Sequence, residues 1–295
     1  MNRNPFKKDE INPIMSFLLL RYGELFLKGG NQYQFIRALC SNIKAITNHG
    51  AQINQGRLNM NYFDEHSLLQ NIFGLVSYSI VQKVNSDLST ITQKATEMLE
   101  SKKGTFRIDT KRSDKRFPTT SLDVNRHIGE HIETHTKLSF SLKDPQNILR
   151  IEINNTGTYL FFDENTYACH GGLPTGIEGR VGLLVEDELS ALAGILIMRR
   201  GCGVYPIILE SNQNPFIEEK TIAKLQKYSP SPVLLTKCTT YEEIDQFVKE
   251  KRLACLITSS TQLNPRTYSL SCVILHPLIC ESQEKITELK KKYLS

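Results

Sequence analysis

The stretch "GLLVEDELSALAGILIMRRG", Gly182 to Gly201, decides the fold of the carboxyl-terminal part of this chain. It begins with an apolar run typical of a buried strand and continues as an amphipathic helix. A strand that enters a helix through a tight loop is where many nucleotide-binding folds hold phosphate. Such loops are usually rich in glycine, whereas this loop reads Glu186-Asp187-Glu188. The segment therefore has the outline of a phosphate-binding turn without its usual residues.

Strands and helices alternate around this segment to the end of the chain. We expect strands at 181–185, 204–209, 233–236, 253–258 and 272–275. We expect helices at 190–200, 217–227, 241–251 and 282–294. Strands that alternate with helices predict a parallel sheet covered on both faces.

The first half of the chain has a different pattern, typical of an α+β fold. Between 16 and 65, "SFLLLRYG" predicts a strand, "NQYQFIRALCSNIKAIT" a helix, and two short strands flank Gln55-Gly56. From 66 to 168 we expect a strand at 77–81, a helix near 87–101 and a strand in "TFRIDTKR". A helix capped by Ser121 should follow, and then two strands in "ILRIEINNTG" and "TYLFFDENTY".

The bulk composition is that of an ordinary globular protein. The 295 residues are 40% hydrophobic and 23% charged, and they suffice for two or three domains. No apolar run approaches the roughly 20 residues that cross a membrane, and residues 1–15 lack the apolar core of a secretory signal. Seven cysteines without a CxxC pair indicate reduced thiols. We therefore expect a cytoplasmic protein with a short amino-terminal extension and no membrane partner.

The net charge of +5 is concentrated in one stretch. Residues 102–116, "KKGTFRIDTKRSDKR", hold seven basic and two acidic residues, a surplus that equals that of the whole chain. Such clustering indicates an anionic partner at this place. From composition alone, a solvated loop rich in lysine is the favoured explanation of this charge.

Three motifs in the right order resemble those of one family, the tRNA 4-thiouridine synthetases, also called tRNA sulfurtransferases. They are "LLLRYGELFLKGGNQYQF", "FRIDTKRSDKRFPTTSLDVNRHIGEHI" and the hinge "GGLPTGIEGRVGLLV", which "LIMRRGC" follows after a short gap. The first resembles the opening of these enzymes and the second the core of their THUMP domain, an RNA-binding module. The similarity runs from about residue 16 to the end and is strongest from 105 to 205.

The resemblance implies a fold and a division into domains. It implies α+β ferredoxin-like and THUMP domains, followed by an α/β Rossmann-like domain of the PP-loop ATPase type with a parallel sheet. We expect an extension at 1–15, a ferredoxin-like domain at 16–65, a THUMP domain at 66–168, a hinge at 169–175 and a degenerate PP-loop-type domain at 176–295.

The resemblance also implies an activity. In that family an SGGxDS loop binds ATP with Mg²⁺, the enzyme adenylates a uridine of tRNA, and a cysteine persulfide delivers sulfur. The first two domains bind the acceptor region and 3′ end of tRNA. Here "LITSSTQLNPRTYS" replaces a TGE-type loop, and we expect Cys272 and Cys280 to be structural. The third region is shorter than the family's catalytic domain, and we expect no appended sulfur-transfer domain.

The SGGxDS position is occupied by Glu186, Asp187, Glu188, Leu189 and Ser190, which is one residue shorter. The glycines that let backbone N–H groups approach phosphate are absent. A carboxylate about 4 Å from a phosphate charge costs about 4 kcal/mol at an effective dielectric near 20. A helix N-terminus stabilises a bound anion by only about 0.3–1 kcal/mol, and by about 2 kcal/mol at most. We expect a loop relaxed into a helix cap that binds no ATP; the alternative is that the acids hold Mg²⁺ and bring ATP in.

The basic THUMP loop is better preserved. Its candidate RNA contacts are Lys111, Arg112, Lys115, Arg116, Phe117 and Arg126. Cations at the end of a strand can contact consecutive phosphates, and an aromatic ring can stack on a base. Phe117 is equally well explained as a packing residue. Arg21, Lys28 and Arg37 are further candidates.

Three histidines, His127, His131 and His135, recur every four residues, and "HIGEH" fits the HxxEH pattern of some zinc peptidases. Histidines at this spacing on a helix can share a metal. The family's helix has no metal role, however, and no downstream glutamate stands out. We expect these histidines to face solvent or RNA, and we assign no catalytic or metal-binding residue.

The sequence thus favours a tRNA-binding protein in which the third region no longer adenylates tRNA and needs no cofactor. That region would remain as a scaffold for self-association or for a separate modification enzyme. The alternative is a divergent, active tRNA uridine sulfurtransferase that uses ATP, Mg²⁺ and a sulfur donor in trans. A metal-dependent hydrolase based on the His127 helix is a third reading.

Overall fold

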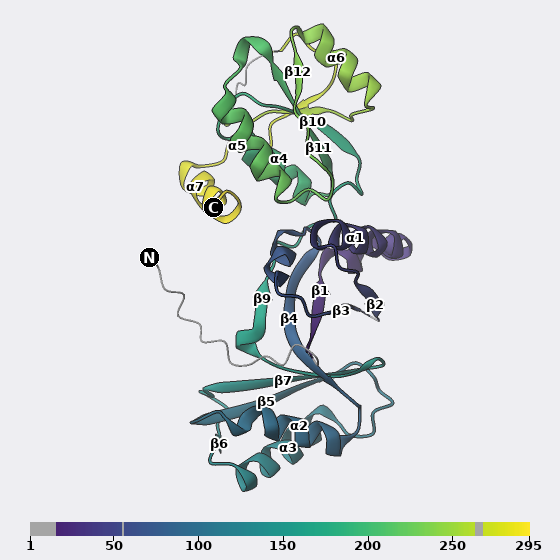
Figure 1. The fold of residues 1–295 in the computed structure, drawn as a ribbon, viewed down its shortest axis with the longest axis vertical. Helices are drawn as coiled ribbons and strands as arrows, with labels where there is room; N and C mark the ends of the chain where they lie inside the picture. The colour runs from purple at the N-terminus through teal and green to yellow at the C-terminus, as the bar shows by residue number, and fades with distance from the viewer. Residues whose placement is uncertain (1–15, 55, 263–267) are drawn as a thin grey trace. The chain divides into compact units, whose positions relative to one another are not determined.

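The computed structural model describes residues 16–54, 56–262 and 268–295. The predicted extension at 1–15, Gln55 of the predicted turn and part of the 256–269 loop lie outside these residues. The described chain forms one nine-stranded sheet and one five-stranded sheet (Figure 1). Among the described residues, every helix is too short or too polar to cross a membrane.

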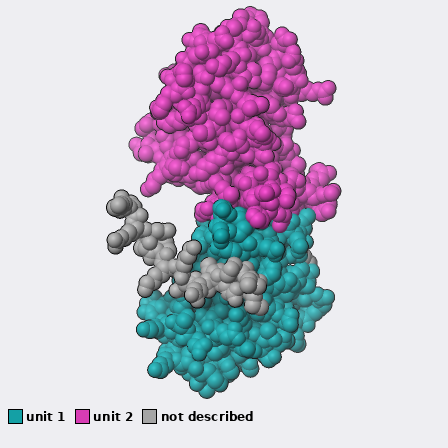
Figure 2. Space-filling view, viewed as in Figure 1, with its two compact units in different colours: residues 1–21, 51–66, 77–168 teal, residues 22–50, 67–76, 169–295 magenta. Residues whose placement is uncertain are grey.

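The chain divides into two compact units, which are coloured separately in Figure 2. Unit 1 takes in the residues up to Arg21 together with 51–66 and 77–168, and unit 2 takes in 22–50, 67–76 and 169–295. The predicted helix of the first region is α1 (Gln32–Thr47), and it belongs to unit 2. There its Asn42 side chain donates to the carbonyl of Thr175 at 3.0 Å. The amino-terminal sequence thus contributes to both units.

The nine-stranded sheet has the order β2-β3-β1-β4-β8-β7-β5-β6, with β9 paired to β4. Its strands are β1 (Ser16–Tyr22), β2 (Gln52–Asn54), β3 (Arg57–Asn61), β4 (Leu75–Val84), β5 (Thr105–Arg112), β6 (Ser139–Phe140), β7 (Asn147–Asn154), β8 (Gly157–Phe162) and β9 (Thr166–Ala168). β5 pairs parallel with β6 and β7, whereas β7 pairs antiparallel with β8. The sheet is therefore mixed.

Two helices, α2 (Leu88–Glu100) and α3 (Ser121–His135), cover one face of β5 and β7 (Figure 1). The strands alternate, so that Ile108 and Ile151 pack under the helices while their neighbours point to the other face. The cap of α3 differs from the prediction. Thr120, not Ser121, is the N-cap, because its hydroxyl accepts the backbone N–H of Asp123 at 3.2 Å.

The five-stranded sheet has the order β12-β11-β10-β13-β14, and its neighbouring strands in the described chain pair parallel. Its strands are β10 (Arg180–Leu184), β11 (Gly203–Leu209), β12 (Thr236–Cys238), β13 (Leu256–Ile257) and β14 (Ile274–Leu275). This confirms the expected parallel α/β fold. The strand predicted at 233–236 begins only at Thr236. The N–H of Val233 donates to the Gln226 side chain at 2.8 Å, which takes it out of the ladder.

Helices lie on both faces of this sheet. α4 (Ser190–Arg199), α5 (Pro215–Gln226) and α7 (Gln283–Tyr293) share one apolar cluster with β10, whereas α6 (Tyr241–Glu250) packs in a separate cluster. α5 begins two residues before the prediction, because the side chain of Asn214 caps it and Pro215 suits its first turn.

An aromatic cluster joins the hinge to the end of unit 2. The ring of Phe73 stacks on Tyr228 with centroids 5.1 Å apart, and His170 lies against Tyr293 at 4.9 Å. The hydroxyl of Tyr228 donates to the carbonyl of Tyr293 at 3.0 Å. The hinge passes close to α4 at Gly172, where a Cβ would lie 2.4 Å from the carbonyl oxygen of Arg199. Only glycine fits that approach, and its φ of 81° is one that glycine adopts readily.

His170 should make unit 2 sensitive to acid. Burial lowers the pKa of this histidine to about 4, helped by the charges of Lys292, Lys227 and Arg199. The unfolded chain therefore binds a proton between about pH 6.5 and pH 4 that the folded chain excludes, so stability falls as the pH falls through that window.

We predict that His170→Gln, measured by urea unfolding at pH 7.5 and pH 5, loses less stability on acidification than the wild-type chain does. The expected difference is on the order of 1 kcal/mol, after allowance for solvent screening of the half-exposed ring. Equal losses in the two proteins would show that His170 does not cause the acid sensitivity.

Candidate functional site

The basic loop of unit 1 joins the end of β5 to α3, and main-chain contacts fix its path. The N–H of Ser113 donates to the carbonyl of Ile153 on β7 at 2.9 Å. The N–H of Thr110 donates to the side chain of Asn125 on α3 at 3.0 Å. Both flanks of the loop are therefore tied to their neighbours, and its side chains project from a defined frame.

Arg112 braces the loop from within. One nitrogen of its guanidinium donates to the carbonyl oxygens of Phe117 at 2.8 Å and Thr119 at 2.9 Å. These carbonyls lie on the far side of the loop, so the side chain closes it as a clasp. Arg112 thus lies in the predicted site, and its described bonds are internal ones that shape the loop.

Lys111 and Lys115 are exposed, and neither makes an ion pair with any residue the structure describes. Lys111 is the register partner of Glu152 on the neighbouring strand. That carboxylate already forms ion pairs with Arg21 and Arg57. The two ammonium groups are therefore available to an anion in solvent.

Arg116 is exposed but paired. Its guanidinium forms a two-pronged contact with Asp114, at 2.9 Å from Nε and 2.8 Å from the second nitrogen. These hydrogen bonds lower the pKa of Asp114 to about 2. The side chain of Arg116 remains 78% exposed, so a phosphate can compete for it against the carboxylate. Asp114 was not recognised from the sequence, although its place two residues before Arg116 was visible.

Two further predicted contacts have different surroundings. Phe117 is 6% exposed and packs in the core beneath α2 and α3. Its ring is therefore a packing residue in this fold and does not offer a stacking surface. Arg126 points to solvent from the first turns of α3 and pairs with Asp123, one turn earlier on the same helix.

Arg21 is part of a charged cluster on the sheet face opposite the helices. Its guanidinium donates to Glu152 at 2.7 Å and to the hydroxyl of Ser79 at 2.8 Å, and Arg57 donates to Glu152 at 3.2 Å. Burial alone would raise the pKa of Glu152, but the two arginines outweigh it and lower it. Arg21 is 17% exposed, and its guanidinium is engaged within this cluster.

The other two amino-terminal candidates lie in unit 2. Lys28 pairs with Glu178 at 2.9 Å, and its ammonium group sits 4.4 Å from the ring centroid of Phe35. Arg37 lies over the ring of Tyr33 at 5.3 Å. Both cations have local partners, and neither lies in the unit that carries the basic loop.

The acidic loop between β10 and α4 satisfies its own backbone. The hydroxyl of Ser190 accepts the N–H groups of Glu186 at 3.1 Å and Asp187 at 3.2 Å. The carboxylate of Asp187 accepts the N–H of Leu189 at 2.8 Å. Three donors at the position where the family binds phosphate are therefore occupied by side chains of the loop itself.

A tyrosine lies over the same edge of the sheet. The hydroxyl of Tyr268 donates to Glu186 at 2.7 Å, and its ring meets that of Tyr241 edge to face, with centroids 6.4 Å apart. The space left among the ends of β10 and β11 and these rings is about 10 Å³, which is near the lower limit for a single water molecule. Tyr268 lies far along the chain, and nothing in the sequence indicated this contact.

Six of the seven cysteines lie in surroundings that disfavour thiolates, and the seventh, Cys280, is exposed. Burial raises the pKa of Cys40, Cys169, Cys202, Cys238, Cys255 and Cys272, and that of Cys169 reaches about 12. A thiolate is the reactive form in sulfur transfer. Burial thus disfavours the reactive form at these six cysteines.

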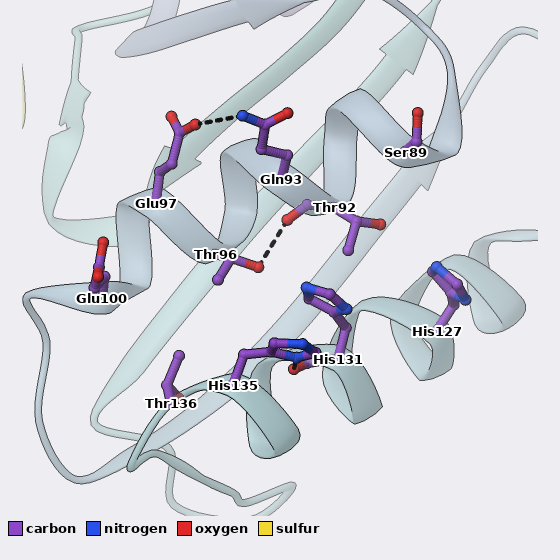
Figure 3. Close-up of a pocket in the computed structure, with 10 residues that line it drawn as sticks. All are labelled: Ser89, Thr92, Gln93, Thr96, Glu97, Glu100, His127, His131, His135 and Thr136. Carbon is purple, nitrogen blue, oxygen red and sulfur yellow. Dashed lines mark hydrogen bonds between the residues drawn. The ribbon is translucent and has the colours of Figure 1, made fainter.

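The histidine helix borders a groove of about 460 Å³ between α2 and α3 (Figure 3). The rings of His131 and His135 stack with centroids 3.9 Å apart, and His127 lies one turn away. Within the described parts of the chain, no group of three or more His, Cys, Asp or Glu side chains is arranged to hold a metal. The arrangement is that of surface histidines beside Thr92, Thr96 and other polar residues of α2.

The clasp of Arg112 predicts a stability effect. We expect Arg112→Ala to destabilise unit 1 by about 1–3 kcal/mol, because two partly buried carbonyls lose a charged donor. Lys111→Ala, which removes an exposed and unpaired cation, should change stability by less than about 0.5 kcal/mol. Urea unfolding followed by circular dichroism measures both, and equal stability of the two variants would contradict the clasp.

Two family models match the chain. The ThiI ferredoxin-like domain matches residues 17–79, and the THUMP domain matches residues 85–163. The basic loop and α3 therefore lie inside the THUMP match, and α1 and all but the first residue of β1 lie inside the ferredoxin-like match.

Relatives and solved structures agree with these models. The probable tRNA sulfurtransferase of Mycoplasmopsis agalactiae is 35% identical over 212 residues, which cover 71% of this chain and 55% of the relative. That of Acetivibrio thermocellus is 34% identical over 239 residues, covering 75% and 59%. The chain thus spans less than two thirds of the length of these relatives.

Two solved structures share the fold. Protein PH1313 of Pyrococcus horikoshii has a TM-score of 0.80 and 24% identity, covering 94% of this chain and 99% of that one. A 4-thiouridine synthetase in complex with RNA and bound ATP has a TM-score of 0.77 and 21% identity, covering 95% and 85%. The tandem models and the relatives together show that this chain belongs to the family of ThiI-type tRNA sulfurtransferases.

Proposed function

We propose that this chain binds tRNA at its acceptor region and 3′ end through the basic loop of the THUMP domain, and that its third region does not adenylate tRNA. That region would serve as a scaffold, for self-association or for a separate modification enzyme or sulfur donor. The proposal keeps the domain bounds expected from the sequence, including the hinge at 169–175.

The RNA-binding part of the proposal rests on the different roles of the cations in the basic loop. Arg112 holds the loop in shape from inside, while Lys111 and Lys115 remain exposed and unpaired among the described residues. A fixed loop with free cations presents charge to phosphates at little cost in ordering. The relatives are named tRNA sulfurtransferases, and one structure of the same fold is a complex with RNA, which supports tRNA as the ligand.

The loss of adenylation is supported by the acidic loop. A phosphate there would have to displace Ser190 and Asp187 from the N–H groups that they occupy, and it would meet the carboxylate of Glu186. One such carboxylate opposes a phosphate charge by about 4 kcal/mol at an effective dielectric near 20. Tyr268 also fills the adjoining space. We infer that ATP does not bind.

The alternative is an active tRNA uridine sulfurtransferase that uses ATP, Mg²⁺ and a sulfur donor in trans. The names of the relatives favour it, as does the retained order of strand, loop and helix from β10 to α4. It requires the acidic loop to open and the acids to bind Mg²⁺. A donor in trans is the source of sulfur in this case, because burial disfavours the thiolate form at Cys169 and Cys272.

The RNA-binding half is tested with a triple variant, Lys111→Ala, Lys115→Ala and Arg116→Ala. We expect its affinity for tRNA to fall about 10- to 100-fold at 0.15 M salt, and the slope of log affinity against log salt to shrink by roughly 2 to 3. Fluorescence anisotropy with labelled tRNA measures both quantities.

The matched control is Lys103→Ala, Lys137→Ala and Lys143→Ala, which removes the same charge near the start of β5, where β6 pairs. Its affinity should stay within about threefold of the wild-type value. Similar losses in both triple variants would show that net charge, rather than this loop, governs binding.

The adenylation half is tested by calorimetric titration of ATP with Mg²⁺ into the chain with tRNA present. We expect no heat of binding at millimolar ATP, because the loop donors are occupied and the acids repel phosphate. Saturable binding would reverse this half of the proposal, and thiolation of tRNA uridine with an added sulfur donor would then establish the alternative.

A further inference from the structure

A second group of cations gathers in unit 2, at the ends of three helices. We name this group the α4–α5–α7 basic surface; its members are Arg199, Arg200, Lys224, Lys227, Lys290, Lys291 and Lys292. The first two end α4, the next two end α5, and the three consecutive lysines form the last turn of α7. None of them belongs to the acidic loop or to the THUMP domain.

The fold brings these helix ends together. α4, α5 and α7 pack in one apolar cluster on the same face of the five-stranded sheet. The ammonium group of Lys227 donates to the carbonyl of Ser295 at 3.2 Å, and Lys224 donates to the carbonyl of Leu294, so the end of α5 touches the end of α7. The guanidinium of Arg199 donates to the carbonyl of His170 at 3.1 Å, which places the end of α4 beside them.

The surroundings of His170 are a second indication that the carboxyl ends of α4, α5 and α7 lie close together. Lys292 from α7, Lys227 next to α5 and Arg199 from α4 all lower the pKa of this one imidazole. The local field at this place is therefore positive.

The cations are not balanced within the chain. Among the residues that the structure describes, none of the seven forms an ion pair. Glu288 lies one turn before Lys292, but its carboxylate is paired with Lys285 at 2.9 Å. Three helix carboxyl ends contribute partial charges of about −0.5 each, which is much less than seven positive charges. A positive surplus remains on the surface.

Stabilisation of the helices accounts for only part of this pattern. A cation near a helix carboxyl end contributes about 0.3–1 kcal/mol, and the half-buried Arg199 and Lys224, which hydrogen bond to main-chain carbonyls, fit that role. Arg200, Lys291 and Lys292 are exposed and have no such bond among those described. The exposed cations therefore call for an external anion.

The geometry points to the phosphate backbone of double-helical RNA as that anion, and we propose that the α4–α5–α7 basic surface binds it. Single-stranded RNA is held by exposed aromatic rings on which bases stack. Here the rings beneath the cations, Tyr228 and Tyr293, are buried, with Lys227 and Lys292 lying over them at 5.6 and 5.4 Å from the ring centroids. A surface with charge and no stacking platform suits a duplex, whose bases are already stacked.

This inference rests on the proposed function for the identity of the polyanion as RNA, and it assigns a second surface to the same ligand. A tRNA offers both a single-stranded 3′ end and a double-helical stem. The two classes of RNA can therefore be presented separately to the full chain.

The experiment uses a triple variant, Lys227→Gln, Lys291→Gln and Lys292→Gln, in which all three changed residues are exposed. The matched control is Lys249→Gln, Lys251→Gln and Arg252→Gln, which removes equal charge at the end of α6, on the other face of the sheet. The probes are a stem minihelix and a single-stranded 3′-end oligonucleotide, each measured by anisotropy over a salt series. Unfolding midpoints verify that both variants fold.

We expect the triple variant to bind the minihelix about tenfold more weakly at 0.15 M salt, with a salt slope smaller by roughly 2 to 3. It should bind the single strand as the wild-type chain does, and the control should bind both probes normally. Unchanged minihelix binding by the triple variant overturns the inference alone, as do equal losses in the control or equal losses for the single strand. A wild-type chain that binds neither RNA overturns the proposed function as well.

Discussion

The backbone N–H groups at the turn from β10 into α4 need acceptors, and the identity of those acceptors governs what unit 2 can do. A glycine-rich loop leaves these donors bare, so that phosphate can take them. In this chain Ser190 and Asp187 take them instead, and Glu186 is held by Tyr268. The loop is thereby stable without a ligand, and the parallel sheet and its helices keep their arrangement around it. In this structure the turn from β10 into α4 is closed by hydrogen bonds to side chains of the chain itself.

The cations of the chain can be divided in the same way: some donate to acceptors within the chain, and others have no such acceptor among the described residues. Arg112 donates to two main-chain carbonyls, and Arg21 forms an ion pair with Glu152. Both contacts lie within unit 1 and shape its fold. Lys111 and Lys115, and the exposed lysines that end α7, have no ion-pair partner among the described residues. Charge in the sequence is therefore a poor guide to a binding site until the hydrogen bonds of each group are known. Most of these unpaired cations are lysines. The lysine ammonium group acts as a compact point charge, which suits contact with a phosphate backbone.

Much of the fold was predictable because periodicity is a local signal. The run 182–201 indicated a buried strand and a helix, and β10 and α4 confirm it. The alternation after it predicted the parallel sheet, and the family resemblance is confirmed by the THUMP and ferredoxin-like models. The errors lie at element ends, where single hydrogen bonds decide: Thr120 replaced Ser121 as the cap of α3, and the bond from Val233 to Gln226 delayed β12. The burial of Phe117 was one of two interpretations that the sequence left open, and only the packing of α2 and α3 distinguished them.

The sequence by itself determined the class of fold, the family, the absence of phosphate-loop glycines and the concentration of charge at 102–116, because each of these depends on residues close together in the chain. Tertiary structure alone decided which of those charges are free. The partner of Arg21 lies 131 residues away at Glu152, and Tyr268 lies 82 residues from Glu186. The ends of α4, α5 and α7 meet only because one sheet face gathers the three helices. A hydrogen bond or a Coulomb interaction depends on distance in space, and separation along the chain does not specify that distance.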